Sequence, residues 1–290
     1  MSSRNNCLIC DAETAYYFSK TYPADALGNF FKEEWKVDYW KCGHCGFTTS
    51  KTHQELSPEV WGKLNSAFHH SHEQRSEAEY SSTLIPLPHF HQPPYYQQAL
   101  ALKILSRKGI IDLDSALDYA AGYGTLSKFL AKYLDTNIKI FDRYVTGDGG
   151  NAQYVPEDQL GTYKVVINSA MFEHVLDRQA LDEINSFVAD DGVLMLHTVI
   201  CERVPPDPDW FYLDPIVHTA FHTNKSMEIL MQQWGYAASL YSPQARSWFL
   251  FKANYPKLAQ IEKAATETNI ELRVGYFSWK PGFVDYWKTF

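Results

Sequence analysis

The hydrophobic pattern is clearest where a short apolar strand leads through a glycine turn into an amphipathic helix. The strand ends at Leu117, the acid Asp118 follows it, and the turn carries Gly122 and Gly124. Apolar side chains then recur at helical spacing at Leu126, Phe129, Leu130, Tyr133 and Leu134. Glycines at such a turn let a ligand approach the helix N-terminus closely. The stretch therefore predicts a ligand-binding strand, turn and helix.

Strands and helices alternate beyond this unit, and such alternation favours an α/β fold with a mostly parallel sheet. A turn at 190–192 is expected to separate a helix that continues to Val188 from the next strand. Two apolar segments near the end predict antiparallel closing strands. The predicted strands cover 138–142, 151–155, 165–167, 193–200, 237–241 and 247–252, and the predicted helices include 95–107, 227–234 and 255–268.

Two C-x-x-C pairs, Cys7 with Cys10 and Cys42 with Cys45, flank alternating aromatic and polar residues near the N-terminus. Each pair brings two thiolates to one ion from a tight turn, so the four cysteines match a closed tetrahedral Zn²⁺ site. Disulfides are the weaker alternative, because no signal sequence precedes the pairs. The pattern predicts a structural zinc ribbon, whereas the fifth cysteine, Cys201, fits a core thiol.

The chain divides into four predicted segments. A zinc ribbon covers 1–50, a helical connecting or lid segment covers 51–109, the main α/β domain covers 110–253, and a C-terminal helix with an aromatic tail covers 254–290. Histidines 69, 70, 72, 89 and 91 lie in the connecting segment without a metal-ligand spacing, so solvated or substrate-facing side chains are the preferred interpretation.

Composition narrows the range of partners. The net charge of -8 over 290 residues disfavours a polyanionic partner such as nucleic acid. No apolar run reaches membrane-spanning length, and no signal-peptide core is present, so we expect a cytoplasmic protein that acts on a small molecule.

Two acids at neighbouring strand ends indicate the kind of ligand. Dinucleotide binders carry G-x-G-x-x-G and place a pyrophosphate on the helix, where the carboxylate of Asp118 is unfavourable. A ligand with an ammonium group and no phosphate suits that acid better. Asp142, at the end of the second strand, can accept the hydroxyl protons of a ribose.

The glycine turn resembles the first motif of class I S-adenosylmethionine (SAM)-dependent methyltransferases, D-x-G-x-G-x-G. Asp118, Gly122 and Gly124 match the motif, and Ala120 departs from it. The resemblance implies a Rossmann-like sheet with an antiparallel last strand, and SAM as cofactor. The expected SAM-binding residues are Asp118, Ala120, Gly122, Gly124, Asp142, Arg143, Ser169 and Tyr96.

A later segment, V-H-T-A-F-H-T, resembles the E-H-x-x-Y-F-S of zinc-binding deoxysugar methyltransferases. His218 and Phe221 are kept, whereas Val217 and Ala220 depart and Thr223 replaces serine. The resemblance implies a sugar or nucleotide-sugar acceptor, and the departures disfavour methylation at carbon. Because histidine suits deprotonation at neutral pH, the expected catalytic bases are His218, then His222 and His174.

Two other functions stay open at this point. A non-catalytic SAM-fold protein would use the ribbon for binding or assembly. A nicotinamide-dependent oxidoreductase would need a complete dinucleotide fingerprint, which the glycine turn lacks.

Overall fold

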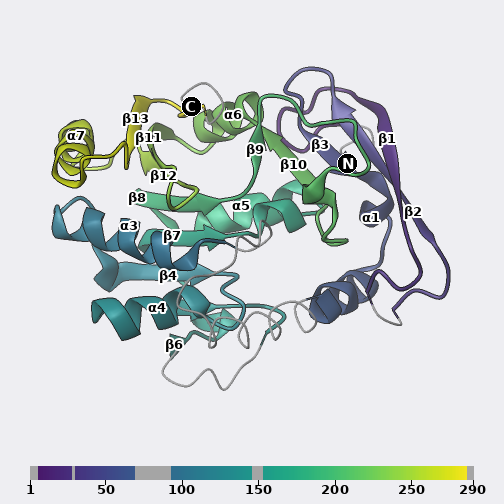
Figure 1. Cartoon of the computed structure of the whole chain (residues 1–290), viewed down its shortest axis with the longest axis horizontal. Helices are drawn as coiled ribbons and strands as arrows, with labels where there is room; N and C mark the ends of the chain where they lie inside the picture. Colours follow the sequence, from purple (N-terminus) through teal and green to yellow (C-terminus); the bar gives the residue numbers. More distant parts are fainter. Residues whose placement is uncertain (1–5, 28–29, 69–92, 146–152, 286–290) are drawn as a thin grey trace.

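A computed structural model gives the fold over residues 6–27, 30–68, 93–145 and 153–285. Its centre is an eight-stranded sheet in the order β13-β11-β12-β8-β7-β4-β5-β6 (Figure 1). The five strands from β6 to β8 pair in parallel, and β12, β11 and β13 continue the sheet antiparallel. The strands are β4 Ala116–Tyr119, β5 Lys139–Phe141, β6 Gln153–Tyr154, β7 Tyr163–Ser169, β8 Val188–His197, β11 Tyr236–Ser242, β12 Ser247–Lys252 and β13 Ser278–Pro281.

Helices cover both faces of this sheet, because its strands carry apolar side chains on both sides. In β7, Val166 packs into one hydrophobic core while Val165 and Ile167 pack into the other. The first core takes α5 Arg178–Ser186 and α6 Asn224–Gln233. The second takes α3 Tyr95–Arg107, α4 Thr125–Leu134 and α7 Ile261–Leu272. The predicted Rossmann-like architecture is confirmed.

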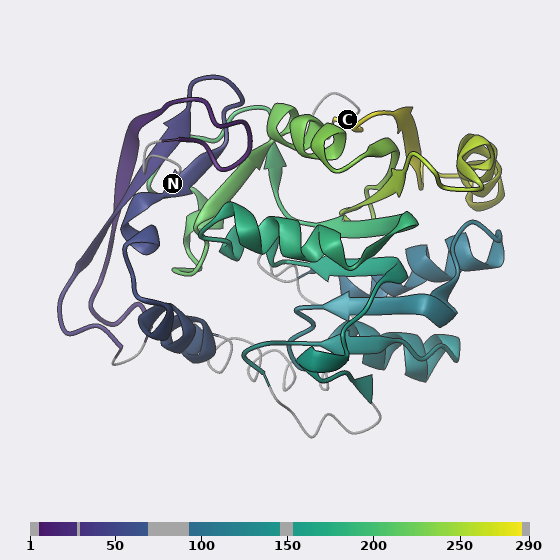
Figure 2. The ribbon, with the colours of Figure 1, turned by 180° about the vertical axis from the view of Figure 1, so that it is seen from behind.

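A second sheet lies at the other end of the molecule, in the order β1-β2-β3-β10-β9 (Figures 1 and 2). The N-terminal strands are β1 Thr14–Tyr22, β2 Trp35–Cys42 and β3 Thr48–Ser50. They continue into β10 Ala220–Thr223 and β9 Ile200–Cys201, which come from the second half of the chain. The cysteine-bearing ribbon is therefore hydrogen-bonded to the segment that carries the predicted catalytic histidines.

Several predicted elements are observed with changed bounds. Gly192 lies inside β8, at a register shift against β7, and not in a turn before the strand. A Cβ there would come within 3.0 Å of the Ala189 carbonyl oxygen, so the bulge needs glycine. The last helix begins at Ile261, after a 3₁₀ turn over Leu258–Gln260, because Pro256 and the turn before it interrupt the predicted start.

Connecting elements complete the described chain. A short helix α1 spans Lys51–Gln54, and another helix covers 58–68. The 3₁₀ turns are η1 Leu113–Ser115, η2 Glu157–Gln159, η3 Phe172–His174, η4 Phe211–Leu213 and η5 Leu258–Gln260. The five histidines between 69 and 91 and the first part of strand 151–155 lie outside the described residues. Within the described ranges, no helix combines the length and apolar character that a bilayer crossing requires.

Candidate active site

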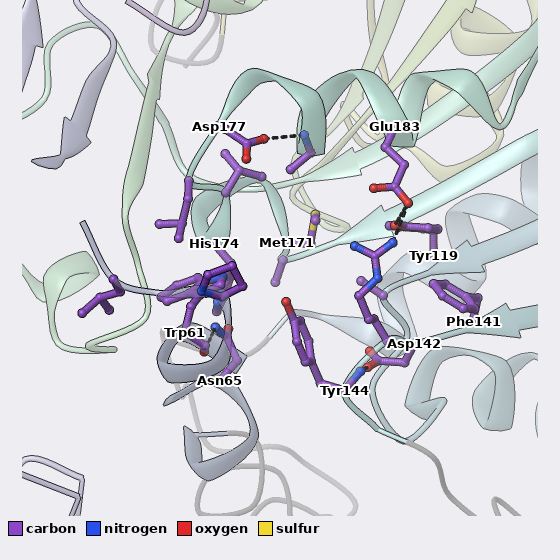
Figure 3. Close-up of a pocket in the computed structure, with 18 of the residues that line it drawn as sticks. Trp61, Asn65, Tyr119, Phe141, Asp142, Tyr144, Met171, His174, Asp177 and Glu183 are labelled. Carbon is purple, nitrogen blue, oxygen red and sulfur yellow. Dashed lines mark hydrogen bonds and ion pairs between the residues drawn. The ribbon is translucent and has the colours of Figure 1, made fainter. Parts of the chain in front are cut away.

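A cavity of about 430 Å³ opens at the C-terminal ends of β4, β5 and β7, where open α/β sheets bind ligands. Asp142 and Tyr144 lie on one side, and His174 lies on the other with residues of helix 58–68 (Figure 3). Met171 lies between the two sides. The lining includes Trp61, Asn65, Tyr119, Ala120, Phe141, Asp142, Arg143, Tyr144, Ala170, Met171, His174 and Glu183.

The glycine turn after β4 adopts the left-handed backbone that its sequence predicts. Gly122 has a φ of 54°, and Gly124, the N-cap of α4, has a φ of 71°. Ala120 has a φ of 61°, so this departure from the methyltransferase motif falls at a position where glycine carries no steric cost. Tyr154 donates a hydrogen bond to the Gly122 carbonyl at 2.7 Å and holds the turn beside the next strand.

Asp142 joins this turn to the end of β5. Its Oδ2 accepts the Gly122 N–H at 2.8 Å, and its Oδ1 accepts the N–H groups of Tyr144 and Val145 at 2.8 Å each. The carboxylate is 9% exposed and lines the cavity. Two carboxylate oxygens have about four acceptor directions, so Asp142 can still accept a hydroxyl proton from a ligand.

Asp118 lies deeper than Asp142 and is 2% exposed. Burial, and then the nearby charge of Asp142, raises the pKa of the Asp118 carboxyl from 3.8 to about 8. It does not line the cavity. Asp118 therefore cannot contact a ligand in the cavity directly, and it can act on one only through the charge of its carboxylate.

The remaining expected cofactor residues are distributed unevenly. Arg143 lines the cavity and pairs with Glu157 at 2.9 Å and Glu183 at 2.7 Å. Ser169 is buried and donates to Gln98 Oε1 at 3.0 Å. Tyr96 is 46% exposed and packs against Phe129 and Tyr133 on α4. Neither Ser169 nor Tyr96 lines the cavity.

Two of the three expected catalytic histidines come together. His174 lines the cavity, and the buried His218 packs behind it with ring centroids 5.0 Å apart. The His218 Nδ1 lies 2.7 Å from the Tyr212 carbonyl oxygen, which favours the tautomer that leaves Nε2 as an acceptor. His222 lies apart, against Phe47 and Phe172, and burial lowers its pKa to about 3.

Glu173 completes the histidine cluster, although it is not among the expected catalytic residues. It is 2% exposed, and burial raises its pKa to about 7. Ligand atoms of Glu173, His174 and His218 lie within 4.8 Å of one another. This arrangement can share a proton, and the same donor set can also hold a divalent ion.

A second cavity of about 660 Å³ adjoins the first, and Ala170 lines both. It lies beyond the end of β8, between η4 and the β11–β12 turn. Residues 197–203 line part of it, and five aromatic side chains come from the aromatic and proline-rich stretch around 204–212 and from the closing hairpin. Sequence reasoning missed this cavity, and the aromatic stretch was its only signal.

The four N-terminal cysteines converge on one point. Their sulfur atoms lie within 4.8 Å of one another, and all four are free thiols. Backbone N–H groups of Ile9 and His44 approach the sulfurs of Cys7 and Cys42 at 3.4 and 3.3 Å. Thiolates that accept such N–H groups and point to a common centre fit a tetrahedral zinc ion.

Comparison with known proteins identifies the class. Residues 91–241, just over half of the chain, match the family described as methyltransferase domain, and the chain belongs to that family. The matched region is a methyltransferase domain. With the family shown, the nicotinamide-dependent oxidoreductase is set aside. No curated protein matches the sequence.

Solved structures resemble the chain at low identity. An O-methyltransferase family protein from Burkholderia thailandensis is 18% identical, with a TM-score of 0.42, and the match covers 56% of each chain. The chain thus spans little more than half of that protein. The magnesium protoporphyrin IX methyltransferase of Synechocystis with bound SAH is 16% identical over 64% of this chain and 96% of that one (TM-score 0.41). DesVI of Streptomyces venezuelae is 14% identical over 55% and 92% (TM-score 0.40).

Proposed function

We propose that this chain transfers the methyl group of SAM to a hydroxyl of a small polar acceptor, a sugar or nucleotide-sugar, with a histidine as general base. The observation that carries the proposal is that Asp142 and His174 lie on opposite sides of the same cavity. Asp142 binds the ribose, and Gly122, Gly124 and Ala120 shape the turn that holds the methionyl part. The four cysteines hold a structural zinc ion.

Asp118 contributes charge to the bound state in this proposal. A cationic ligand near the turn favours the ionised carboxylate, so SAM binding near pH 7 is expected to release up to about one proton. Without ligand, the unfolded chain loses this proton near pH 4 and the folded protein near pH 8. The free energy of unfolding therefore falls as pH rises between these values, by up to about 1.4 kcal/mol per pH unit.

Calorimetry of SAM binding in two buffers of different ionisation enthalpy measures the released proton. The Asp118→Asn variant is expected to release less, to bind SAM more weakly, and to lose most of the decline in stability with pH. Equal proton release by both proteins would show that Asp118 does not respond to the cofactor.

The acceptor proton passes to the histidine pair in the proposed reaction. The acceptor oxygen attacks the methyl carbon, the carbon–sulfur bond breaks, and the O–H proton goes to the His174 imidazole. His218 and the buried Glu173 behind it stabilise the resulting positive charge. The proposed general base is therefore His174, which lines the cavity, and not His218, the first candidate from the sequence.

Replacement of His174 by glutamine is expected to lower kcat by about 10²- to 10⁴-fold, the usual contribution of a general base. SAM affinity should stay within about threefold, and the acidic limb of the kcat pH profile should disappear. Added imidazole should restore part of the rate. A His174→Gln enzyme with normal kcat and an unchanged pH profile would remove this residue from the chemistry.

A further inference from the structure

The second cavity has a preformed aromatic wall. Trp210 packs against Phe211 and Tyr212 with ring centroids 6.0 and 5.5 Å apart, and Tyr241 packs against Trp248 at 4.4 Å. All five rings line the cavity. Because the rings are held by one another, a planar or ring-shaped ligand can stack on them with little ordering cost.

Two arginines lie at the same cavity. Arg203 follows β9, and Arg246 lies in the turn between β11 and β12; both side chains are exposed. Neither makes a side-chain hydrogen bond or ion pair with another residue in the described ranges. Guanidinium groups in this state are suited to bind a planar carboxylate or a phosphate through paired N–H donors.

Carboxylates near the arginines do not neutralise them directly. Glu202 also lines the cavity, but its Oε2 lies 3.3 Å from the Asn224 side-chain amide, which donates to it. Glu173 lies at the inner end, where burial raises its pKa to about 7. Because the whole chain carries a net charge of -8, an anion gains no general attraction from the protein and needs such local cations.

The two cavities meet at the end of β7. Ala170 lines both and has a φ of 64°, which bends the chain away from the strand. The η3 turn that follows carries Glu173 toward the aromatic cavity and His174 toward the cofactor cavity. A ligand in the aromatic cavity therefore lies beside Glu173, whose carboxyl is within 4.8 Å of a ring nitrogen of His174, the proposed base.

We propose that the aromatic cavity is the acceptor site and that it selects an acceptor with a ring and an anionic group, a carboxylate or a phosphate. The ring stacks on the wall around Trp210, and Arg203 and Arg246 bind the anion. This inference rests on the proposed function and adds the charge of the acceptor to it.

Binding of small probes to the protein saturated with S-adenosylhomocysteine (SAH) tests the inference. Phenyl phosphate and benzoate carry both features, phenyl glucoside is neutral, and glucose 1-phosphate lacks the aromatic ring. At least one of the two aromatic anions is expected to bind at least tenfold more tightly than phenyl glucoside. Tryptophan fluorescence reports binding, because Trp210 and Trp248 line the site.

Variants test separately the arginine contacts to the anion and the Trp210 contact to the ring. Arg203→Ala with Arg246→Ala is expected to weaken the bound aromatic anion about 10- to 100-fold, as for charged hydrogen bonds, and to leave phenyl glucoside unchanged. Trp210→Ala should weaken the binding of the aromatic anion and of phenyl glucoside more than the binding of glucose 1-phosphate. Arg107→Ala, exposed in the last turn of α3 and outside both cavities, is the matched control.

Two results would overturn the inference. One is equal affinity for aromatic anions and phenyl glucoside, and the other is anion binding that persists in the double arginine variant. SAM and SAH affinities are measured separately in every variant. A protein that binds neither cofactor contradicts the proposed function, whereas cofactor binding without anion selectivity contradicts this inference alone.

Discussion

Replacement of Asp142 by alanine is expected to lower SAM affinity about 10- to 150-fold. The proposed contact is one hydrogen bond from a ribose hydroxyl to the acceptor direction that the backbone N–H groups leave open, and a bond to a charged group contributes about 1.5–3 kcal/mol. That free energy corresponds to a factor of about 10 to 150. The same carboxylate also accepts the Gly122 N–H, so its loss loosens the turn that holds the methionyl part. Isothermal titration with SAM and with SAH measures the effect.

Structural damage must be distinguished from lost recognition, because Asp142 also accepts the N–H groups of Tyr144 and Val145. Asp142→Asn keeps the shape, and its one acceptor oxygen can still accept the Tyr144 and Val145 N–H groups, so it should fold with a smaller loss of melting temperature than Asp142→Ala and still lose most of the affinity. Asp135→Asn is the control. Asp135 is exposed at the end of α4 with a φ of 47°, a conformation that asparagine tolerates. Affinity within threefold of normal in Asp142→Asn would reject the ribose contact.

Most of the fold follows from local patterns in the sequence. The helix predicted over 95–107 and the hairpin strands over 237–241 and 247–252 are observed nearly as predicted. The helix shows a strong helical period because it packs against a single core, whereas the two strands are apolar on both faces because they contribute to both cores. The β8 bulge at Gly192 was not predicted, because a glycine after two acids is also typical of a turn. The pairing of β3 with β10 joins residues far apart in the chain, and no local pattern shows it.

The site was predictable only where a residue's role depends on its own strand or turn. Asp142, Gly122 and Gly124 lie at the ends of elements that the sequence defines. The structure places Asp142 at the cavity, and Gly122 and Gly124 in the turn that Asp142 holds by a hydrogen bond. His222 is four residues from His218 yet lies in an apolar core, because His222 belongs to β10, whereas His218 precedes that strand. Tyr96 similarly faces α4 and not the ligand. Such directions depend on packing between distant segments.

The turn that carries Cys45 also contacts the segment between β10 and α6. The Thr223 hydroxyl, which caps α6, donates to the Cys45 carbonyl at 2.5 Å. A Cβ on Gly46, next to that cysteine, would lie 3.1 Å from Thr223 Cγ2, so the turn packs tightly on the helix cap. Loss of the proposed zinc ion should therefore disturb β10 and the segment that carries His218.

Cys42→Ser is expected to lower the zinc content from about one ion per chain to nearly zero. The unfolding midpoint should fall by roughly 10 °C or more, because zinc binding contributes directly to the folding of such small segments. Methyl transfer should fall with it, through the movement of β10, while residual SAM binding persists.

Metal analysis of the purified chain, of Cys42→Ser and of Cys201→Ala tests whether the four cysteines hold the zinc ion. Cys201 is buried in β9 and is not one of the four clustered thiols, so its variant should keep the full zinc content. Zinc retained by Cys42→Ser would contradict the four-cysteine site. A second ion that survives in Cys42→Ser and disappears in Glu173→Gln would assign the Glu173, His174 and His218 cluster to a metal and replace the histidine base, because a coordinated imidazole nitrogen cannot accept the proton.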